Sequence, residues 1–231
     1  MVELFKTKKT NCNYIFFPNF CGLTIPKSIF NNLEKPDLNK FGCPSISSVK
    51  NKIYNANSFV SVEIEFGLKD NEPYYNYVLD EKTMQINNDV HTLIKSLIVL
   101  QYENDAINLQ LLAPYAFVTD DKELEFTTVM PNMKTENCNY IHGGFKPYYW
   151  VRSFNSSWTL KDINKPGKLY FDINNPFISV VFNKSVDLKY MEITKDINNY
   201  LNESFRINSF RKNLNNIYSN VLSRRPRRLL K

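Results

Sequence analysis

Alternation of apolar and polar residues over strand-length segments is the feature that most constrains this fold. In VSVEIEFG, every second residue from Val60 to Phe66 is apolar and the residues between them are polar. Because neighbouring side chains of a β-strand point to opposite faces, this pattern predicts a strand with one face in the core. The pattern recurs in AINLQLLAP (106–114), LEFTTVM (124–130) and KLYFDI (168–173), whereas FISVVF (177–182) is apolar on both faces and predicts an inner strand. The expected inward residues of the three alternating segments are Ile107, Leu109, Leu111, Leu124, Phe126, Thr128, Met130, Leu169, Phe171 and Ile173.

Turn-forming residues separate these segments. They cluster at 70–73, 119–122, 142–144 and 174–176. Short strands with such punctuation are typical of sandwiches and barrels, and all-β domains of 231 residues are often single units. We therefore expect a mainly β protein with a β-sandwich or jelly-roll-like body over residues 1–192. Two short helices are predicted at 26–33 and 45–54, and the pattern at 92–102 fits either a strand or a helix.

The segment after residue 192 differs in kind. Its apolar residues recur at helical spacing up to Leu222, which predicts a long amphipathic helix over 193–223. The helix contains eight asparagines, which are weak helix formers, so its stability depends on burying the apolar stripe. We expect it to pack on the β body, on another copy or on a different protein. The expected contact residues are Phe210, Leu214, Ile217 and Val221.

The excess positive charge lies at the C-terminus. Residues 206–231 contain eight basic and no acidic residues, which leaves 21 basic against 23 acidic residues in the first 205 positions. The basic tail, residues 224–231, could bind phosphates or an acidic protein surface, because each guanidinium offers a planar fork to an oxyanion. The other interpretation is a solvated tail. The predicted partner-binding arginines are Arg224, Arg225, Arg227 and Arg228.

An aromatic segment precedes the last strands. Tyr148, Trp150 and Arg152 would share one side of an extended chain, with Trp158 shortly after them. Such a set could stack against bases or sugars. Aromatic residues of all-β proteins also commonly form the core, so both interpretations stay open.

Catalytic and metal-binding patterns are weak. The four cysteines include no C-x-x-C pair, there are only two histidines, His91 and His142, and no P-loop, G-x-G-x-x-G or G-x-S-x-G pattern occurs. The acidic run 120–125 predicts a charged turn rather than a cation site. A cupin-like metal-dependent oxygenase would need a second ligand two residues after its first histidine, where Gly144 stands. We expect no cofactor and no metal, buried reduced thiols, and no secretory signal or membrane span.

Several segments together resemble a group of uncharacterised proteins encoded by T4-like phages of marine cyanobacteria. The similarity extends over about residues 14–183 and does not include the basic C-terminal segment. It implies a viral origin and location in the host cytoplasm or the virion, and it implies no activity. The matching segments are Thr24-Ile25-Pro26-Lys27, Gly42-Cys43-Pro44-Ser45-Ile46, Ala113-Pro114-Tyr115, Thr119-Asp120-Asp121, Gly143-Gly144-Phe145, Pro176-Phe177 and Val180-Val181-Phe182.

These observations favour a non-enzymatic viral binding or assembly protein that docks through its C-terminal helix and basic tail. Its partner would be another protein or a second copy of the chain. One alternative is a nucleic-acid-binding regulator that uses the arginine-rich tail, and another is the cupin-like oxygenase.

Overall fold

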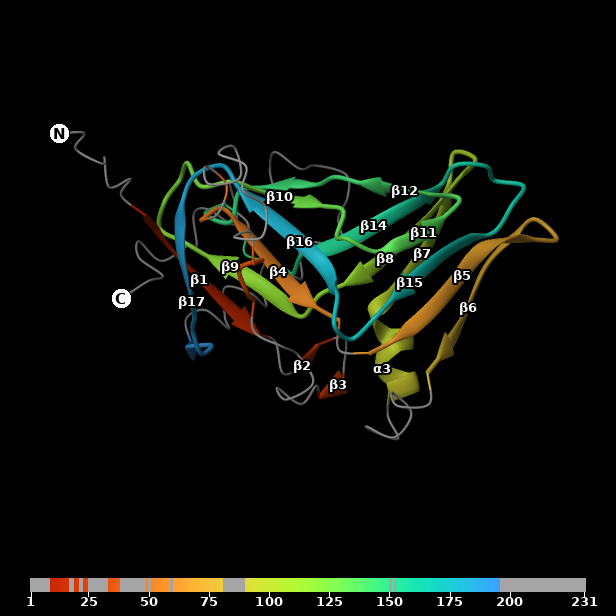
Figure 1. Cartoon of the computed structure of the whole chain (residues 1–231), viewed down its shortest axis with the longest axis horizontal. Coiled ribbons are helices and arrows are strands. Elements are labelled where there is room, and N and C mark those ends of the chain that lie inside the picture. The colour runs from red at the N-terminus through yellow and green to blue at the C-terminus, as the bar shows by residue number, and fades with distance from the viewer. Residues whose placement is uncertain are drawn as a thin grey trace.

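The alternating segments form antiparallel β-strands arranged in several sheets around an apolar core (Figure 1). The structure is a computed structural model. It describes residues 9–16, 19–20, 23–24, 33–37, 49, 51–58, 60–80, 90–149, 151 and 153–195. The predicted mainly β class is confirmed for this part of the chain. Residues 196–231 lie outside it, and with them nearly all of the predicted C-terminal helix.

Two four-stranded sheets form one side of the core. The first is ordered β11 (Lys134–Glu136), β15 (Gly167–Phe171), β5 (Val62–Lys69) and β6 (Glu72–Leu79). The second is ordered β13 (Gly144–Phe145), β10 (Phe126–Val129), β16 (Pro176–Phe182) and β4 (Ile53–Asn57). Chain continuity links the two sheets, because β4 leads into β5 and β15 leads into β16. At the two ends of the interruption, Asn57 lies opposite Pro176 and Val62 lies opposite Phe171, and a register shift follows between Pro176 and Ile178.

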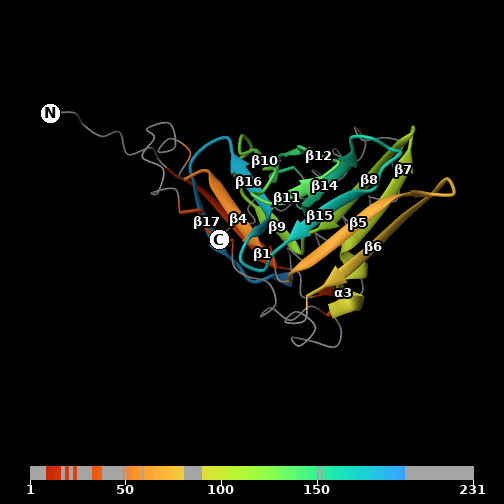
Figure 2. The same ribbon diagram turned by 45° about the vertical axis from the view of Figure 1, so that its right-hand side comes forward.

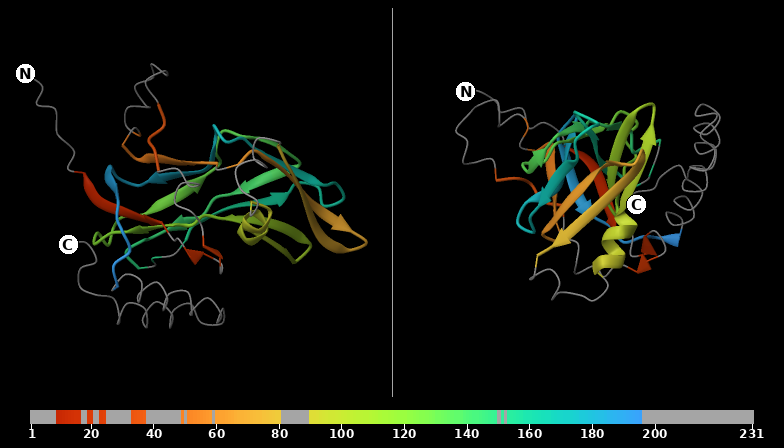
Figure 3. Two further views of the ribbon diagram at one scale, coloured as in Figure 1. Left: turned by 90° about the horizontal axis from the view of Figure 1, so that it is seen from below. Right: turned by 90° about the vertical axis from the view of Figure 1, so that its right-hand side faces the viewer.

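The remaining strands form the facing layer. One sheet is ordered β12 (Cys138–Ile141), β14 (Asn155–Leu160), β8 (Ala106–Leu112) and β7 (Ile98–Glu103). The other is ordered β17 (Val186–Tyr190), β1 (Thr10–Phe16) and β9 (Tyr115–Val118), with β17 parallel to β1. A separate short hairpin joins β2 (Asn19–Phe20) and β3 (Leu23–Thr24). Figures 2 and 3 show the layers enclosing a common interior.

Two tight hairpins have the same turn geometry. Asp70 and Asn71 join β5 to β6 with φ of 54° and 65°, and Asn104 and Asp105 join β7 to β8 with φ of 52° and 59°. Positive φ at both central residues defines a type I′ turn, whose twist matches that of the flanking strands. Asn and Asp tolerate this conformation better than other residues with side chains. The turn predicted at 70–73 is thus confirmed at Asp70 and Asn71, whereas Glu72 and Pro73 belong to β6.

One part of the core is a cluster of phenylalanines. Phe117 stacks on Phe154 at 4.9 Å between ring centroids and meets Phe126 and Phe182 edge-on. Elsewhere the helix α3 (Val90–Leu97) contacts β7 and β8 and buries one face of its surface (Figures 1 and 3). The buried residues of α3 are Val90, Leu93, Ile94 and Leu97.

Three sequence predictions need correction. Met130 and Ile173 are 41% and 39% exposed, because β10 ends at Val129 and β15 ends at Phe171 and the alternation does not continue past these ends. The helix predicted at 45–54 is wrong at its end, where residues 53 and 54 belong to β4. The ambiguous segment 92–102 contains both elements, since α3 ends at Leu97 and β7 begins at Ile98. Most of the helix predicted at 26–33 lies outside the described residues.

Candidate functional site

The predicted aromatic surface does not form as one unit. Trp158, in β14, is fully buried and meets Tyr140 and Phe171 edge-on at 5.4 and 5.8 Å. It therefore belongs to the core and contributes nothing to an exposed stacking surface. Tyr148 is half-buried, packs edge-on against Tyr149 at 5.1 Å and lies beneath the Lys122 ammonium at 5.6 Å. Trp150 and Arg152 lie outside the described residues.

The predicted partner-binding residues of the C-terminal segment also lie outside the described part. These are Phe210, Leu214, Ile217, Val221, Arg224, Arg225, Arg227 and Arg228.

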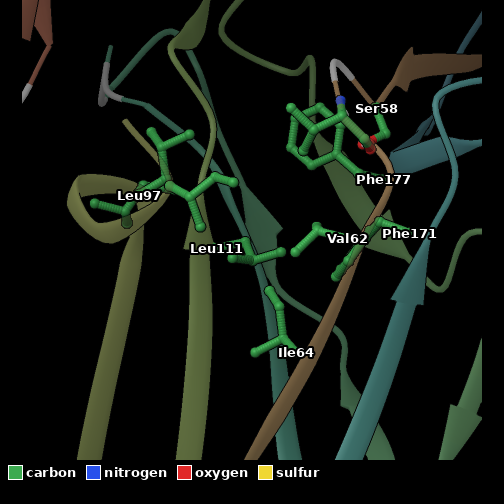
Figure 4. Close-up of a pocket in the computed structure, with 10 residues that line it drawn as sticks. Ser58, Val62, Ile64, Leu97, Leu111, Phe171 and Phe177 are labelled. Atoms are coloured by element: carbon green, nitrogen blue, oxygen red, sulfur yellow. Dashed lines mark hydrogen bonds between the residues drawn. The ribbon is translucent and has the colours of Figure 1, made fainter. Parts of the chain in front are cut away.

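A small cavity lies beside α3, between strands β5 and β8 (Figure 4). Its volume is about 30 Å³, and Figure 4 shows Leu97 and Leu111 on one side of it facing Val62 and Phe171 on the other. Ser58 is the one polar side chain in the lining, and its hydroxyl donates to the Val60 carbonyl at 2.6 Å. The cavity has room for a few atoms, and its lining offers no charge. It can accept a small apolar group, whereas a cofactor or a sugar would not fit.

The cavity forms where long strands are interrupted. Ser58 and Val60 lie in the connection from β4 to β5, Leu112 ends β8, and Phe171 and Phe177 flank the connection from β15 to β16. Interrupted strands pack less closely than continuous ones, which leaves the space. Alternation correctly predicted that Val62 and Leu111 face inward, but no sequence signal placed the interruptions next to one another.

The described thiols are buried. Cys12 and Cys138 are both free and buried. Burial raises the pKa of Cys138 to about 11, and burial, with the nearby Asp121 carboxylate, raises that of Cys12 further. Nucleophilic and metal-binding cysteines need the thiolate form, which burial disfavours here. The expectation of buried reduced thiols is confirmed for these two residues, and Cys21 and Cys43 lie outside the described part.

The two histidines lie on different elements. His91, near the start of α3, is exposed, and its Nδ1 lies 3.0 Å from the Tyr77 hydroxyl on β6. His142 follows β12, and its Nδ1 lies 3.1 Å from the Thr128 carbonyl. Within the described ranges, no group of three His, Cys, Asp or Glu side chains could hold a metal ion.

Asp121 links the loop before β10 to the loop before β17 through Lys184. Its carboxylate accepts hydrogen bonds from Lys184 at 2.6 Å, from the Thr10 hydroxyl at 3.3 Å and from the Glu123 amide at 2.9 Å. Burial acts to raise the pKa of Asp121, but these hydrogen bonds and the Lys184 charge outweigh it and lower the pKa. This arrangement agrees with a charged structural turn.

The outer face of the β11-β15-β5-β6 sheet carries a mutually paired polar network. Lys168 lies 2.9 Å from Glu63 and 3.5 Å from Glu65. Tyr170 donates to Glu136 at 3.1 Å and lies beneath the Lys134 ammonium at 4.4 Å. Each charge in the network already faces an opposite charge or a hydroxyl. The face therefore suits a polar contact better than the capture of a free ion.

None of the helices in the described ranges is long and apolar enough to cross a membrane. Comparison of the chain with protein-family models, with curated proteins and with solved structures finds no match.

Proposed function

We propose that this chain is a non-enzymatic binding or assembly protein. Its β body, of sandwich or jelly-roll type, would carry a C-terminal segment, residues 193–231, that docks on another surface. The resemblance to cyanophage proteins supports a viral role in the host cytoplasm or the virion. The body described above supplies buried thiols, separated histidines and an apolar cavity, and none of these supports a reaction.

The distribution of arginine is the observation that carries the proposal. Six of the seven arginines lie in residues 206–231, whereas only two of the 22 lysines lie there. The chain thus uses lysine for ordinary surface charge and concentrates arginine in one segment. Arginine differs from lysine in binding carboxylate and phosphate through two parallel hydrogen bonds. The partner of the basic tail would therefore present oxyanions, as an acidic protein face does.

Burial of the apolar stripe gives a direct test of docking. We expect slow amide exchange over residues 197–222 in the intact chain, because packed helices exchange slowly. Leu214→Asp with Ile217→Asp should remove this protection, since two charges enter the buried stripe. Asn213→Asp with Asn216→Asp adds the same charge on the polar side and should keep it. Unprotected amides in the wild-type chain, alone and with an added acidic polypeptide, would contradict the proposal.

The same arginines favour a nucleic-acid-binding regulator as the second candidate. Binding of an oligonucleotide should then weaken with salt, and four phosphate contacts give a slope of log affinity against log salt of about −3.6. Replacing Arg224, Arg225, Arg227 and Arg228 by alanine should abolish this slope. Replacing them by lysine should keep the slope and lower the affinity, because the charge stays and the fork is lost. Salt-independent or absent binding rejects this candidate.

The cupin-like oxygenase gains no support from the described residues. Its two candidate ligands, His91 and His142, lie on α3 and after β12 with no acidic partner between them.

A further inference from the structure

Strand β6 is paired on one side, and within the described residues no strand pairs with its other side. It pairs with β5 along its whole length, from Glu72 opposite Lys69 to Leu79 opposite Val62. It is the last strand of its sheet, and Figures 1 and 2 show no strand beside its other side. Strand β7 lies near β6 but belongs to the facing layer and does not pair with it.

The hairpin geometry fixes which backbone groups point to the free side. Lys69 and Glu72 flank a two-residue turn, so they form a hydrogen-bonded pair, and hydrogen-bonded pairs then alternate along the ladder. The even-numbered residues of β6 therefore bond to β5, while Tyr75, Tyr77 and Leu79 direct their N–H and C=O groups outward. Within the described ranges, the backbone groups of these three residues make no hydrogen bond to a turn or a loop. Pro73 shares their orientation and has no N–H to leave unpaired, the usual place of proline in an edge strand.

In the part of the chain that the structure describes, strand β6 after Glu72 carries none of the charges or bulges that normally protect a free edge. Edge strands are usually short, charged, bulged or covered. Residues 73–79 carry no charge, their pairing with β5 shows no register shift, and Val78 is 67% exposed, the highest value among the large hydrophobic residues described. Two other described edges are protected: β17 carries Asp187 and Lys189, and the second side of β4 is bridged by Glu34.

We propose that β6 pairs antiparallel with β6 of a second copy of this chain. Outward-directed residues must lie opposite outward-directed residues, which excludes half of the possible registers. Two allowed registers overlap by seven residues, Tyr75 opposite the partner's Tyr77 and Tyr75 opposite the partner's Tyr75. The first forms more hydrogen bonds, because the second places Pro73 opposite Tyr77 within the ladder. The first register places Asn76 on the two-fold axis and Pro73 opposite the partner's Leu79. About six backbone hydrogen bonds would form, and proline would interrupt only the ends of the ladder.

This register is self-complementary in its side chains. On the outer face, Tyr74 lies opposite the partner's Val78, so each exposed valine gains an aromatic neighbour on both halves of the symmetric interface. Residues 73–79, which form the ladder, are uncharged, so like charges do not meet within it. Beyond the ladder, Glu72 lies opposite the partner's Asp80 at two exposed ends, where strands fray. The paired β6 strands would join two four-stranded sheets into one continuous sheet.

The first test compares two substitutions at one position. The solution mass of the full chain should show a dimer for the wild type. Tyr75→Pro removes an N–H that the monomer does not use but the dimer needs, and should weaken association by about tenfold or more. Tyr75→Ala removes the same side chain, keeps the N–H and should leave a dimer. A monomeric wild type at every soluble concentration, or a dimer indifferent to Tyr75→Pro, overturns the proposal.

The second test does not depend on how Tyr75→Pro folds. In the proposed dimer, Asn76 forms a non-hydrogen-bonded pair with Asn76 of the second copy. The two Cα atoms would lie about 4.5 Å apart, within the range that a disulfide spans. Asn76→Cys should cross-link readily on mild oxidation, with the 76–76 peptide identified by mass spectrometry. Val78→Cys should not cross-link, because residue 78 lies opposite the partner's Tyr74, four residues along the strand from the partner's residue 78. Equal cross-linking of both variants, or of neither, overturns the register.

Discussion

Asn137 shows how one side chain can organise a whole connection. Its φ is 52°, a conformation that Asn adopts more readily than other residues with side chains. Its amide donates to the carbonyls of Asp162 at 2.9 Å and Lys165 at 2.8 Å, and its carbonyl oxygen accepts the Asp162 N–H at 3.0 Å. The loop after β14 is therefore shaped around this residue.

Substitutions of Asn137 separate the contribution of its side-chain hydrogen bonds from that of its positive φ. Asn137→Ala should lower the free energy of unfolding by about 2 to 4 kcal/mol, because it loses these hydrogen bonds and holds alanine at positive φ. Asn137→Gly loses the bonds without the strain and should cost less. Asn139→Ala, at an exposed position on β12, is the control and should change little. Denaturant unfolding measures all three, and equal losses for alanine and glycine would contradict a backbone contribution.

At the scale of elements, the Asp121–Lys184 pair joins the loop before β10 to the loop before β17. Because the pKa of Asp121 is lowered in the folded chain, its contribution to stability is present above the unfolded pKa and is lost as pH falls through the folded pKa. Asp121→Asn should therefore lower stability near pH 7, by about 0.5 to 1 kcal/mol for a partly exposed pair, and should make little difference at strongly acid pH.

Thermal unfolding of the variant and wild type across this pH range tests the contribution of Asp121. Glu123→Gln, at an exposed position in the same turn, is the control and should follow the wild type. A loss for Asp121→Asn that is as large at low pH as at neutral pH would show that the carboxylate charge is not responsible.

Element boundaries mark the limit of prediction from the sequence. Val62, Ile64 and Phe66 face the core as alternation predicts, because side-chain direction in a strand depends only on local geometry. Met130 and Ile173 follow the same alternation and are exposed, since the ends of β10 and β15 depend on where partner strands stop. Trp158 is a similar case, because only the tertiary fold decides whether an aromatic residue is buried. The docking residues of the C-terminal segment stay predictions.

At the scale of the whole molecule, the cavity beside α3 leaves room for a larger side chain in the core. Val62→Ile adds one methylene toward the cavity and should raise the free energy of unfolding by about 0.8 kcal/mol. Val180→Ile adds the same methylene at a fully buried position of β16 that does not line the cavity. It should lower stability by about 1 to 3 kcal/mol, because a close-packed core resists extra volume. Calorimetry compares the two, and a loss at Val62 equal to that at Val180 would contradict the usable space.

The pairs Asn57–Pro176 and Val62–Phe171 link the lengths of two distant connections. Residues 58–61 separate β4 from β5, and residues 172–175 separate β15 from β16, so both connections have the same length. A one-residue insertion in one connection alone would turn the apolar side chains of half the ladder toward water, unless an irregularity such as the register shift between Pro176 and Ile178 absorbed it. Matched changes in both connections avoid this cost, and related chains should show matched gains and losses there.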